Sequence, residues 1–170
     1  MRKISDYIGN ELLIFQKSIW KREFELRSGD ELIALMYYPT FFGDRTELSI
    51  QNEAFEFFRP RFFSREVAVR KKGYENPFAR FTTNFFGRKG ALELPRGIKL
   101  NMKFGIFKKQ TEIYLGENDL LVTILSQFSV KRRSEVVIAK RSELIDEYPW
   151  IIMLGFYLSQ VRKRSSAVGS

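Results

Sequence analysis

The sequence predicts an all-β protein, a closed antiparallel barrel of about twelve strands around one central hydrophobic α-helix near the C-terminus. Two observations carry this prediction. Between residues 21 and 140 the chain is a succession of short segments in which polar and apolar residues alternate, separated by turn sequences. Residues 148–161 are apolar on nearly every side, which is typical of an enclosed helix. Phenylalanine, at 17 of 170 residues, further favours strands.

The first residues, 1–11, lack the continuous apolar core of a signal peptide. Asp6 to Phe15 is interpreted as a short helix or a lead-in segment. Eleven strands are then predicted at residues 21–27, 31–37, 46–51, 54–58, 65–71, 77–83, 90–94, 97–105, 111–115, 120–125 and 135–140. Between two of them, Pro39 to Arg45 is predicted to be a loop with Gly43 and Asp44 at its tip.

The C-terminal helix is predicted over about residues 142–163, with Ser142 as a plausible N-cap and Pro149 in a helical first turn. Asp146 and Glu147 suit the positive end of a helix dipole, and the basic residues 162–164 suit the negative end. A membrane span needs about 20 apolar residues, and this run is shorter. A short tail anchor oriented by the basic residues is the alternative.

A barrel that closes around this helix would cover its apolar surface and leave no exposed sheet edge. Gly155 and Ser159 would let barrel side chains approach the helix closely. We therefore expect residues 1–165 to form one domain, with residues 166–170 as a loose tail. The absence of a signal peptide predicts a cytoplasmic protein, with peripheral attachment to the inner membrane face as a further expectation.

This order of strands, followed by the terminal sequence from Glu147 to Leu158, resembles the tubby C-terminal-like superfamily. More narrowly, it is similar to the LURP-one-related and phospholipid-scramblase-like branch. The resemblance covers most of the chain and rests on architecture. It implies a barrel around a hydrophobic helix and, for tubby-like members, phosphoinositide binding by basic surface residues. The Pro-rich N-terminal extension and acylated cysteines associated with scramblases are missing, so lipid scrambling is not expected.

The residue types argue against an enzyme. The chain contains no histidine and no cysteine, which excludes Ser/His and Cys/His nucleophilic catalysis and the commonest metal ligand. Glu53 with Glu56 could form a carboxylate pair, whereas Glu143, Asp146 and Glu147 are interpreted as helix-capping residues. Gly87–Gly90 and Gly116–Asp119 are interpreted as turns. No catalytic residue, cofactor or metal site is predicted.

The net charge of +9 is concentrated in the middle of the chain, where residues 59–109 contain Glu66, Glu75 and Glu93 as their acidic residues. Such a basic patch attracts anionic headgroups, nucleic acid or an acidic partner. A solvated face that only aids solubility is the plainer alternative. The candidate anion-binding residues are Arg59, Arg61, Arg65, Arg70, Lys71 and Lys72, followed by Arg80, Arg88 and Lys89.

Aromatic residues interleave with arginines between Phe55 and Arg65, and Phe85–Phe86 repeats the pattern on a smaller scale. Phe57, Phe58, Phe62 and Phe63 are therefore candidate contact residues, although alternation places some of these rings inside a barrel. The leading hypothesis is a non-enzymatic protein that binds an anionic phospholipid surface. The alternatives are a nucleic-acid-binding barrel whose rings stack on bases, and a protein-interaction or structural domain. The sequence predicts no oligomeric state.

Overall fold

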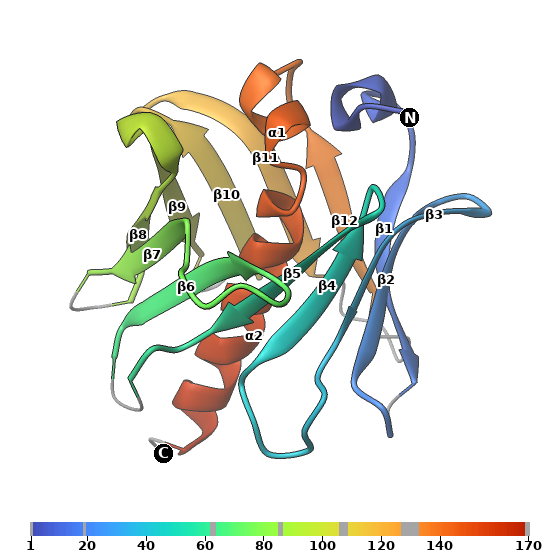
Figure 1. Cartoon of the computed structure of the whole chain (residues 1–170). Coiled ribbons are helices and arrows are strands. Elements are labelled where there is room, and N and C mark those ends of the chain that lie inside the picture. Colours follow the sequence, from blue (N-terminus) through green and yellow to red (C-terminus); the bar gives the residue numbers. More distant parts are fainter. Residues whose placement is uncertain are drawn as a thin grey trace.

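Twelve antiparallel strands form a closed barrel in the computed structural model of the chain, as the sequence predicts (Figure 1). The structure describes residues 2–18, 20–61, 64–84, 87–105, 109–126 and 133–168, with side chains up to residue 162. The strands are β1 (Leu12–Ser18), β2 (Glu23–Ser28), β3 (Glu31–Tyr37), β4 (Thr46–Ile50), β5 (Glu53–Phe58), β6 (Glu66–Lys71), β7 (Ala79–Thr83), β8 (Lys89–Glu93), β9 (Lys99–Phe104), β10 (Gln110–Leu115), β11 (Asp119–Ser126) and β12 (Arg133–Ile138). The helical segments are η1 (Ile4–Tyr7), η2 (Pro95–Gly97), α1 (Glu143–Glu147) and α2 (Ile151–Val168).

Each strand pairs with its neighbours in the chain, and β1 closes the ring by pairing with β12. In this closing pair Leu12 lies opposite Val136 and Ile14 lies opposite Ser134. The prediction of a helix or lead-in over Asp6 to Phe15 was therefore wrong for its second half, which belongs to β1. The run Leu12-Leu-Ile-Phe15 contains no polar residue, so its sequence carries no alternation that would have indicated a strand.

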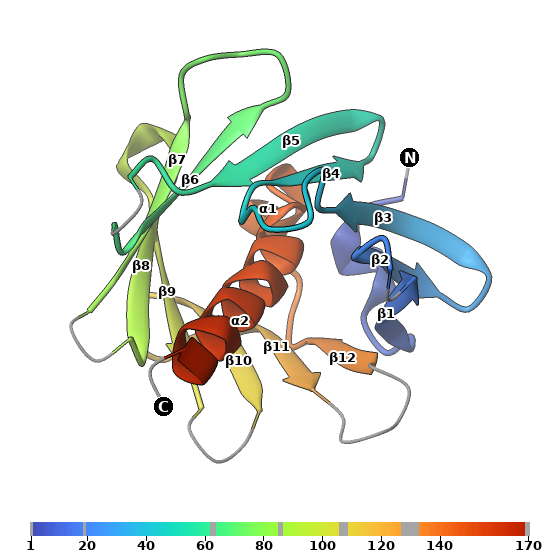
Figure 2. The same cartoon turned by 90° about the horizontal axis from the view of Figure 1, so that it is seen from below.

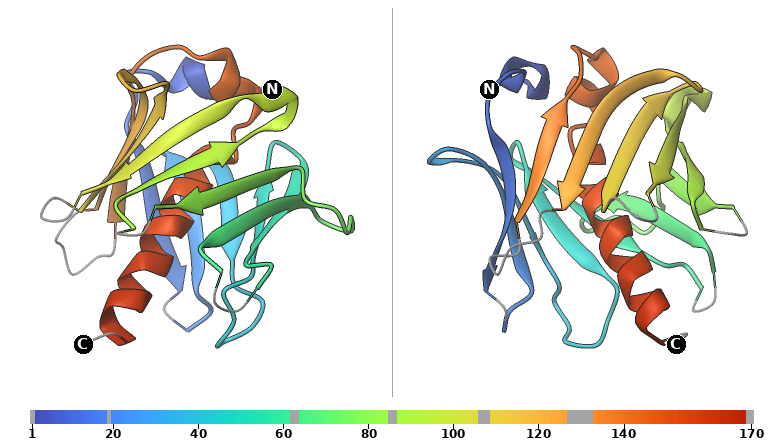
Figure 3. Two further views of the ribbon diagram at one scale, coloured as in Figure 1. Left: turned by 90° about the vertical axis from the view of Figure 1, so that its left-hand side faces the viewer. Right: turned by 180° about the vertical axis from the view of Figure 1, so that it is seen from behind.

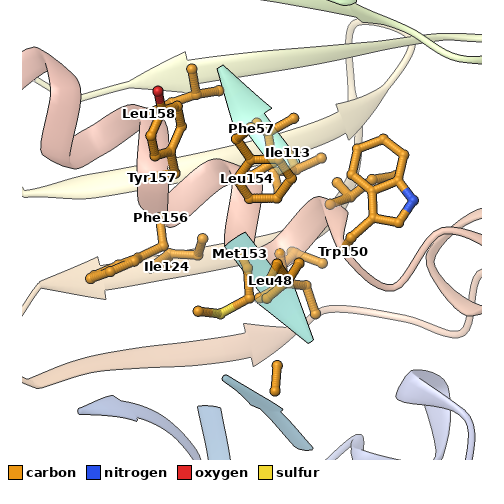
Figure 4. Packing of buried hydrophobic residues seen from close by; sticks show 14 of the residues in the cluster. Leu48, Phe57, Ile113, Ile124, Trp150, Met153, Leu154, Phe156, Tyr157 and Leu158 are labelled. Atoms are coloured by element: carbon orange, nitrogen blue, oxygen red, sulfur yellow. The ribbon is translucent and has the colours of Figure 1, made fainter. Parts of the chain in front are cut away.

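Alternate residues of the strands point inward and pack against α2, which the ring of strands surrounds (Figure 2). Along α2, Ile152, Leu154 and Tyr157 are completely buried, and Phe57 and Ile113 of the barrel pack around them (Figure 4). The prediction that the barrel encloses the helix is confirmed. Among the described helices, none combines the length and apolarity that crossing a bilayer requires.

The predicted single helix over residues 142–163 is two helices, because Tyr148 leaves the helical conformation with φ −122° and ψ 64°. Pro149 explains the break, since its ring disfavours a helical conformation in the residue before it. Ser142 precedes α1, but its side chain makes no cap hydrogen bond. At the other end α2 continues to Val168, so residues 166–168 of the predicted tail are helical.

The two short segments η1 and α1 lie together over one end of the barrel, and α2 leaves at the opposite end (Figure 3). The backbone N–H of Ser5 donates to the Asp146 carboxylate at 2.8 Å, and the Ser142 N–H donates to the Ser5 hydroxyl at 3.1 Å. Asp146 thus accepts a hydrogen bond from η1, a tertiary contact beyond the predicted helix-capping role. One end of the barrel is therefore covered by η1 and α1, whereas α2 leaves the barrel at the other end (Figure 3).

Candidate functional site

At the end where α2 leaves the barrel, the described residues of five strand connections form a surface that we call the lower rim. These connections join β1 to β2, β3 to β4, β5 to β6, β7 to β8 and β9 to β10, because alternate connections of an up-and-down barrel share one end (Figure 1). In sequence, Asp44 is the single acidic residue of these connections, whereas each of them contains a basic residue. The opposite connections mix both signs, as Asp30, Glu75 and Arg96 illustrate. The barrel is therefore electrically polar along its axis.

The structure divides the nine predicted basic residues into two groups. Five of them form ion pairs, mostly across neighbouring strands. The pairs are Arg59–Asp44 at 3.6 Å, Arg70–Glu56 at 2.6 Å, Lys71–Glu53 at 3.4 Å, Lys72–Glu47 at 2.6 Å and Arg80–Glu66. Burial alone would raise the pKa of Glu47, but hydrogen bonds from Lys72 and Tyr37 outweigh it and lower that pKa. These five cations are partly neutralised on the barrel wall.

The remaining predicted cations, Arg61, Arg65, Arg88 and Lys89, are exposed and lie on or beside the lower rim. Arg61, Arg88 and Lys89 have no carboxylate partner within the described part of the chain. Arg162, in the C-terminal half of α2, lies at the same end of the barrel, with its guanidinium 4.9 Å from the centre of the Phe104 ring. Burial and the neighbouring charge of Arg88 lower the pKa of Arg162. Several cations therefore gather at this end of the barrel, and three of them, Arg61, Arg88 and Lys89, lack a carboxylate partner among the described residues.

Of the four predicted aromatic contact residues, the structure describes Phe57 and Phe58. Phe57 is completely buried, with its ring 5.6 Å from that of Tyr157, because its position in β5 points inward. Phe58 points outward, and the Arg70 guanidinium lies 4.3 Å from its ring centre. Phe62, Phe63, Phe85 and Phe86 lie outside the described residues. The assignment of Phe57 as a surface contact was wrong.

Three other aromatic residues on the lower rim are exposed, and the sequence analysis did not single them out. Trp20 is 85% exposed, Phe41 69% and Phe42 94%, although large aromatic side chains are usually well buried. The rings of Phe41 and Phe42 meet edge to face at 4.8 Å. One signal was present in the sequence. Two adjacent phenylalanines within the predicted loop from Pro39 to Arg45 have no strand alternation to turn either of them inward.

The connection between β3 and β4 that carries these phenylalanines is anchored from three directions. Nη1 of Arg22 donates to the carbonyl oxygens of Phe41 at 2.8 Å and Gly43 at 3.3 Å. The Tyr157 hydroxyl of α2 donates to the carbonyl of Asp44 at 2.7 Å, and burial raises the pKa of this phenol. The Asp44 carboxylate pairs with Arg59. The loop is held by a strand connection, by the core helix and by β5's end.

A hollow of about 560 Å³ lies between this loop and the β1–β2 connection, with Trp20 and Phe41 on its sides and Arg22 and Tyr38 among its lining residues. The Arg22 guanidinium stacks on the Tyr38 ring at 3.7 Å. Arg22 itself has a φ of 48°, in the left-handed region that residues other than glycine seldom adopt. The local backbone therefore accepts strain while Arg22 holds the loop.

The structure shows how the carboxylates that could bind a metal ion or form an acid/base pair are arranged. Among the described residues, no cluster of three or more Asp, Glu, His or Cys side chains could hold a metal ion. The candidate carboxylates Glu53 and Glu56 are engaged separately, by Lys71 and by Arg70 together with Arg45. What the rim offers is positive charge beside exposed aromatic rings.

Comparisons with protein-family models, with curated proteins and with solved structures found no match. The resemblance to the tubby C-terminal-like superfamily therefore stays a prediction from the order of the elements.

Proposed function

We propose that the protein is a non-enzymatic membrane-surface protein that binds anionic phospholipid through the lower rim of its barrel. The single observation that carries this proposal is the presence of Arg61, Arg88 and Lys89 at the basic end of the barrel. All three are exposed, and none has a carboxylate partner among the described residues. A bilayer that displays anionic headgroups, as the cytoplasmic leaflet does, is a flat anionic surface that many such cations can face together.

The exposed aromatic rings favour a lipid surface over nucleic acid. Single-stranded nucleic acid is bound along a groove in which rings lie flat against successive bases. The predicted ring Phe57 is inside the barrel, and Arg70 lies over Phe58. Trp20, Phe41 and Phe42 instead project from connections at the end of the barrel. Aromatic side chains in such positions are typical of membrane-interface contacts.

The test compares two triple variants of equal charge in flotation with anionic and neutral vesicles. Arg61→Gln/Arg88→Gln/Lys89→Gln removes the unpaired cations of the rim. The matched control, Lys99→Gln/Lys140→Gln/Arg141→Gln, removes three exposed cations at the opposite end, all in surface ion pairs. Each basic residue near an anionic surface contributes about 1 kcal/mol, so we expect the rim variant to lose about 100-fold in affinity.

The wild-type protein and the control variant are expected to float with anionic vesicles at low salt and to be released, at least in part, by high salt. Equal losses in the two triple variants would show that net charge alone matters and would contradict a rim-specific site. Failure of the wild-type protein to bind anionic vesicles, combined with salt-sensitive binding of a single-stranded oligonucleotide, would replace this proposal by the nucleic-acid alternative.

A further inference from the structure

Trp20, Phe41 and Phe42 are the three exposed aromatic residues of the lower rim, and we call them the aromatic tip. They add an apolar contact surface to the positive charge of the rim. Trp20 and Phe41 line the same hollow, and the ring of Phe42 packs against that of Phe41. Each side chain is at least two-thirds exposed, so water contacts a contiguous apolar group at the end of the barrel. Contiguous exposed apolar surface marks a contact site with a partner or a membrane.

The loop bearing Phe41 and Phe42 is fixed before any partner arrives. Arg22 holds two of its carbonyl groups, and Tyr157 of the core helix holds a third. The Asp44–Arg59 ion pair joins this loop to the chain segment that leads towards Arg61. A preorganised loop loses little conformational freedom on binding. The anchoring thus holds Phe41 and Phe42 at the end of the barrel that also carries the exposed cations.

This combination matches the chemistry of a bilayer interface. Tryptophan and phenylalanine side chains partition into the boundary between headgroups and acyl chains, while cations beside them remain at the level of the phosphates. The surrounding connections contain Asp44 as their single acidic residue, and that residue is paired with Arg59. An exposed apolar tip beside positive charge fits an anionic membrane better than an acidic protein groove, because Trp20, Phe41 and Phe42 are exposed at the end of the barrel.

We propose that the aromatic tip inserts into the acyl-chain boundary of the bilayer, so that the barrel stands on its lower rim with α1 and η1 directed away from the membrane. This inference rests on the proposed function and adds the depth and orientation of binding. It also predicts that part of the affinity survives high salt, since burial of apolar side chains is not screened as charge interactions are.

The two tryptophans make the insertion measurable in the full chain. Trp20 is 85% exposed on the rim, whereas Trp150 is 1% exposed inside the barrel and serves as an internal reference. On mixing with anionic vesicles, we expect the Trp20 emission to shift to shorter wavelength and to be quenched by lipids brominated on their acyl chains. The Trp20→Phe variant, which retains Trp150, is expected to show neither change while still binding.

A pair of double variants tests the contribution of the loop. Phe41→Ser/Phe42→Ser is expected to weaken vesicle binding by roughly tenfold or more and to remove the salt-resistant part of it. The matched control Leu32→Ser/Tyr74→Ser changes two exposed apolar residues at the opposite end and is expected to bind as the wild type does. Circular dichroism and thermal unfolding verify that both variants are folded.

The outcomes separate this inference from the proposed function. Binding to anionic vesicles without a Trp20 shift or acyl-chain quenching would overturn the insertion while leaving headgroup binding intact. No vesicle binding at all would overturn both. Self-association of the wild-type protein that Phe41→Ser/Phe42→Ser abolishes, without any Trp20 quenching by lipid, would assign the aromatic tip to a protein contact and overturn the insertion.

Discussion

At the residue scale, two glycines show how closely side chains approach the backbone inside the barrel. At Gly155 of α2, an added methyl group would lie 3.1 Å from Cδ1 of Ile124 and 3.3 Å from Cδ1 of Ile113. The expectation that Gly155 permits close approach is thereby confirmed. At Gly90 of β8 the methyl group would meet the ring of Phe81 and the carbonyl oxygen of Thr82, the latter at 2.9 Å.

These two positions are expected to respond differently to alanine. Gly90→Ala should lower the free energy of unfolding by about 1 to 3 kcal/mol, because the fully buried Phe81 and a backbone carbonyl have little room to move. Gly155→Ala should be close to neutral, since the gain in helix propensity, about 1 kcal/mol, offsets contacts with the ends of two isoleucines. Urea unfolding of both variants checks this. Equal destabilisation at the two positions would contradict it.

Side-chain alternation explains why the inward-facing residues could be predicted and the partners of the basic residues could not. A period of two identifies the buried side of β9, including Leu100 and Met102, directly from sequence. The pairing of Arg70 with Glu56, in contrast, depends on the register between β5 and β6. Register is set by turns and packing across the sheet, so the sequence did not show which cations were neutralised.

At the scale of elements, the contact between η1 and α1 joins the N-terminal segment to the short helix that precedes the core helix α2. The Ser5 N–H is buried and donates to the Asp146 carboxylate, while Ser142 donates to the Ser5 hydroxyl. These bonds join segments that lie far apart in the sequence. The break at Pro149 makes α1 a separate helix, so this contact is what orients it across the end of the barrel.

Asp146→Ala is expected to lower the free energy of unfolding by about 1 to 3 kcal/mol, because it leaves the buried Ser5 N–H without its acceptor. Asp146→Asn serves as the control, since the amide oxygen of asparagine can accept the same hydrogen bond. Thermal and urea unfolding of the two variants measure the difference. If the asparagine variant were as unstable as the alanine variant, the charge of Asp146 and not its hydrogen bond would hold η1.

Two elements were mispredicted, β1 and the C-terminal helix. The strand β1 opens with four consecutive apolar residues, which periodicity cannot assign to a strand or a helix. Its identity comes from pairing with β12 and β2 at distant positions of the chain. The long helix was predicted as continuous because the residues on both sides of Pro149 favour helices. The effect of the proline on Tyr148 then separated α1 from α2.

At the scale of the whole molecule, the closed barrel could be predicted because strands with one apolar side and one apolar helix have few ways to cover each other. The candidate site depends on which connections share an end, and only the assembled barrel brings the β1–β2 and β3–β4 connections together. Trp20 and Phe41 are separated by two strands in sequence, yet they line one hollow. The basic segment could therefore be predicted from the sequence, whereas the aromatic tip could not.

We expect the whole barrel to unfold at alkaline pH, because the side chains of Tyr7, Tyr38 and Tyr157 are buried. Burial raises the pKa of Tyr38 and of Tyr157 above the ordinary value of 10.0. Burial and the hydrogen bond to Glu31 raise the pKa of Tyr7 to about 12. Above pH 10 the unfolded chain loses these protons while the folded chain keeps them. The unfolded state then binds fewer protons, so the free energy of unfolding falls as the pH rises.

We therefore expect cooperative unfolding as the pH rises from 10.0 towards about 12, with the last tyrosinate absorbance change and the circular dichroism change coinciding. Titration in concentrated denaturant is the control, in which all seven tyrosines should ionise together near their ordinary pKa. In the folded protein we expect Tyr38 and Tyr157 to ionise only when their surroundings open, because both side chains are buried and the Tyr157 hydroxyl donates to the Asp44 carbonyl. Complete tyrosine ionisation near pH 10 with an unchanged circular dichroism spectrum would contradict this expectation. It would show that water reaches the hydroxyls of Tyr38 and Tyr157 while the barrel is still folded.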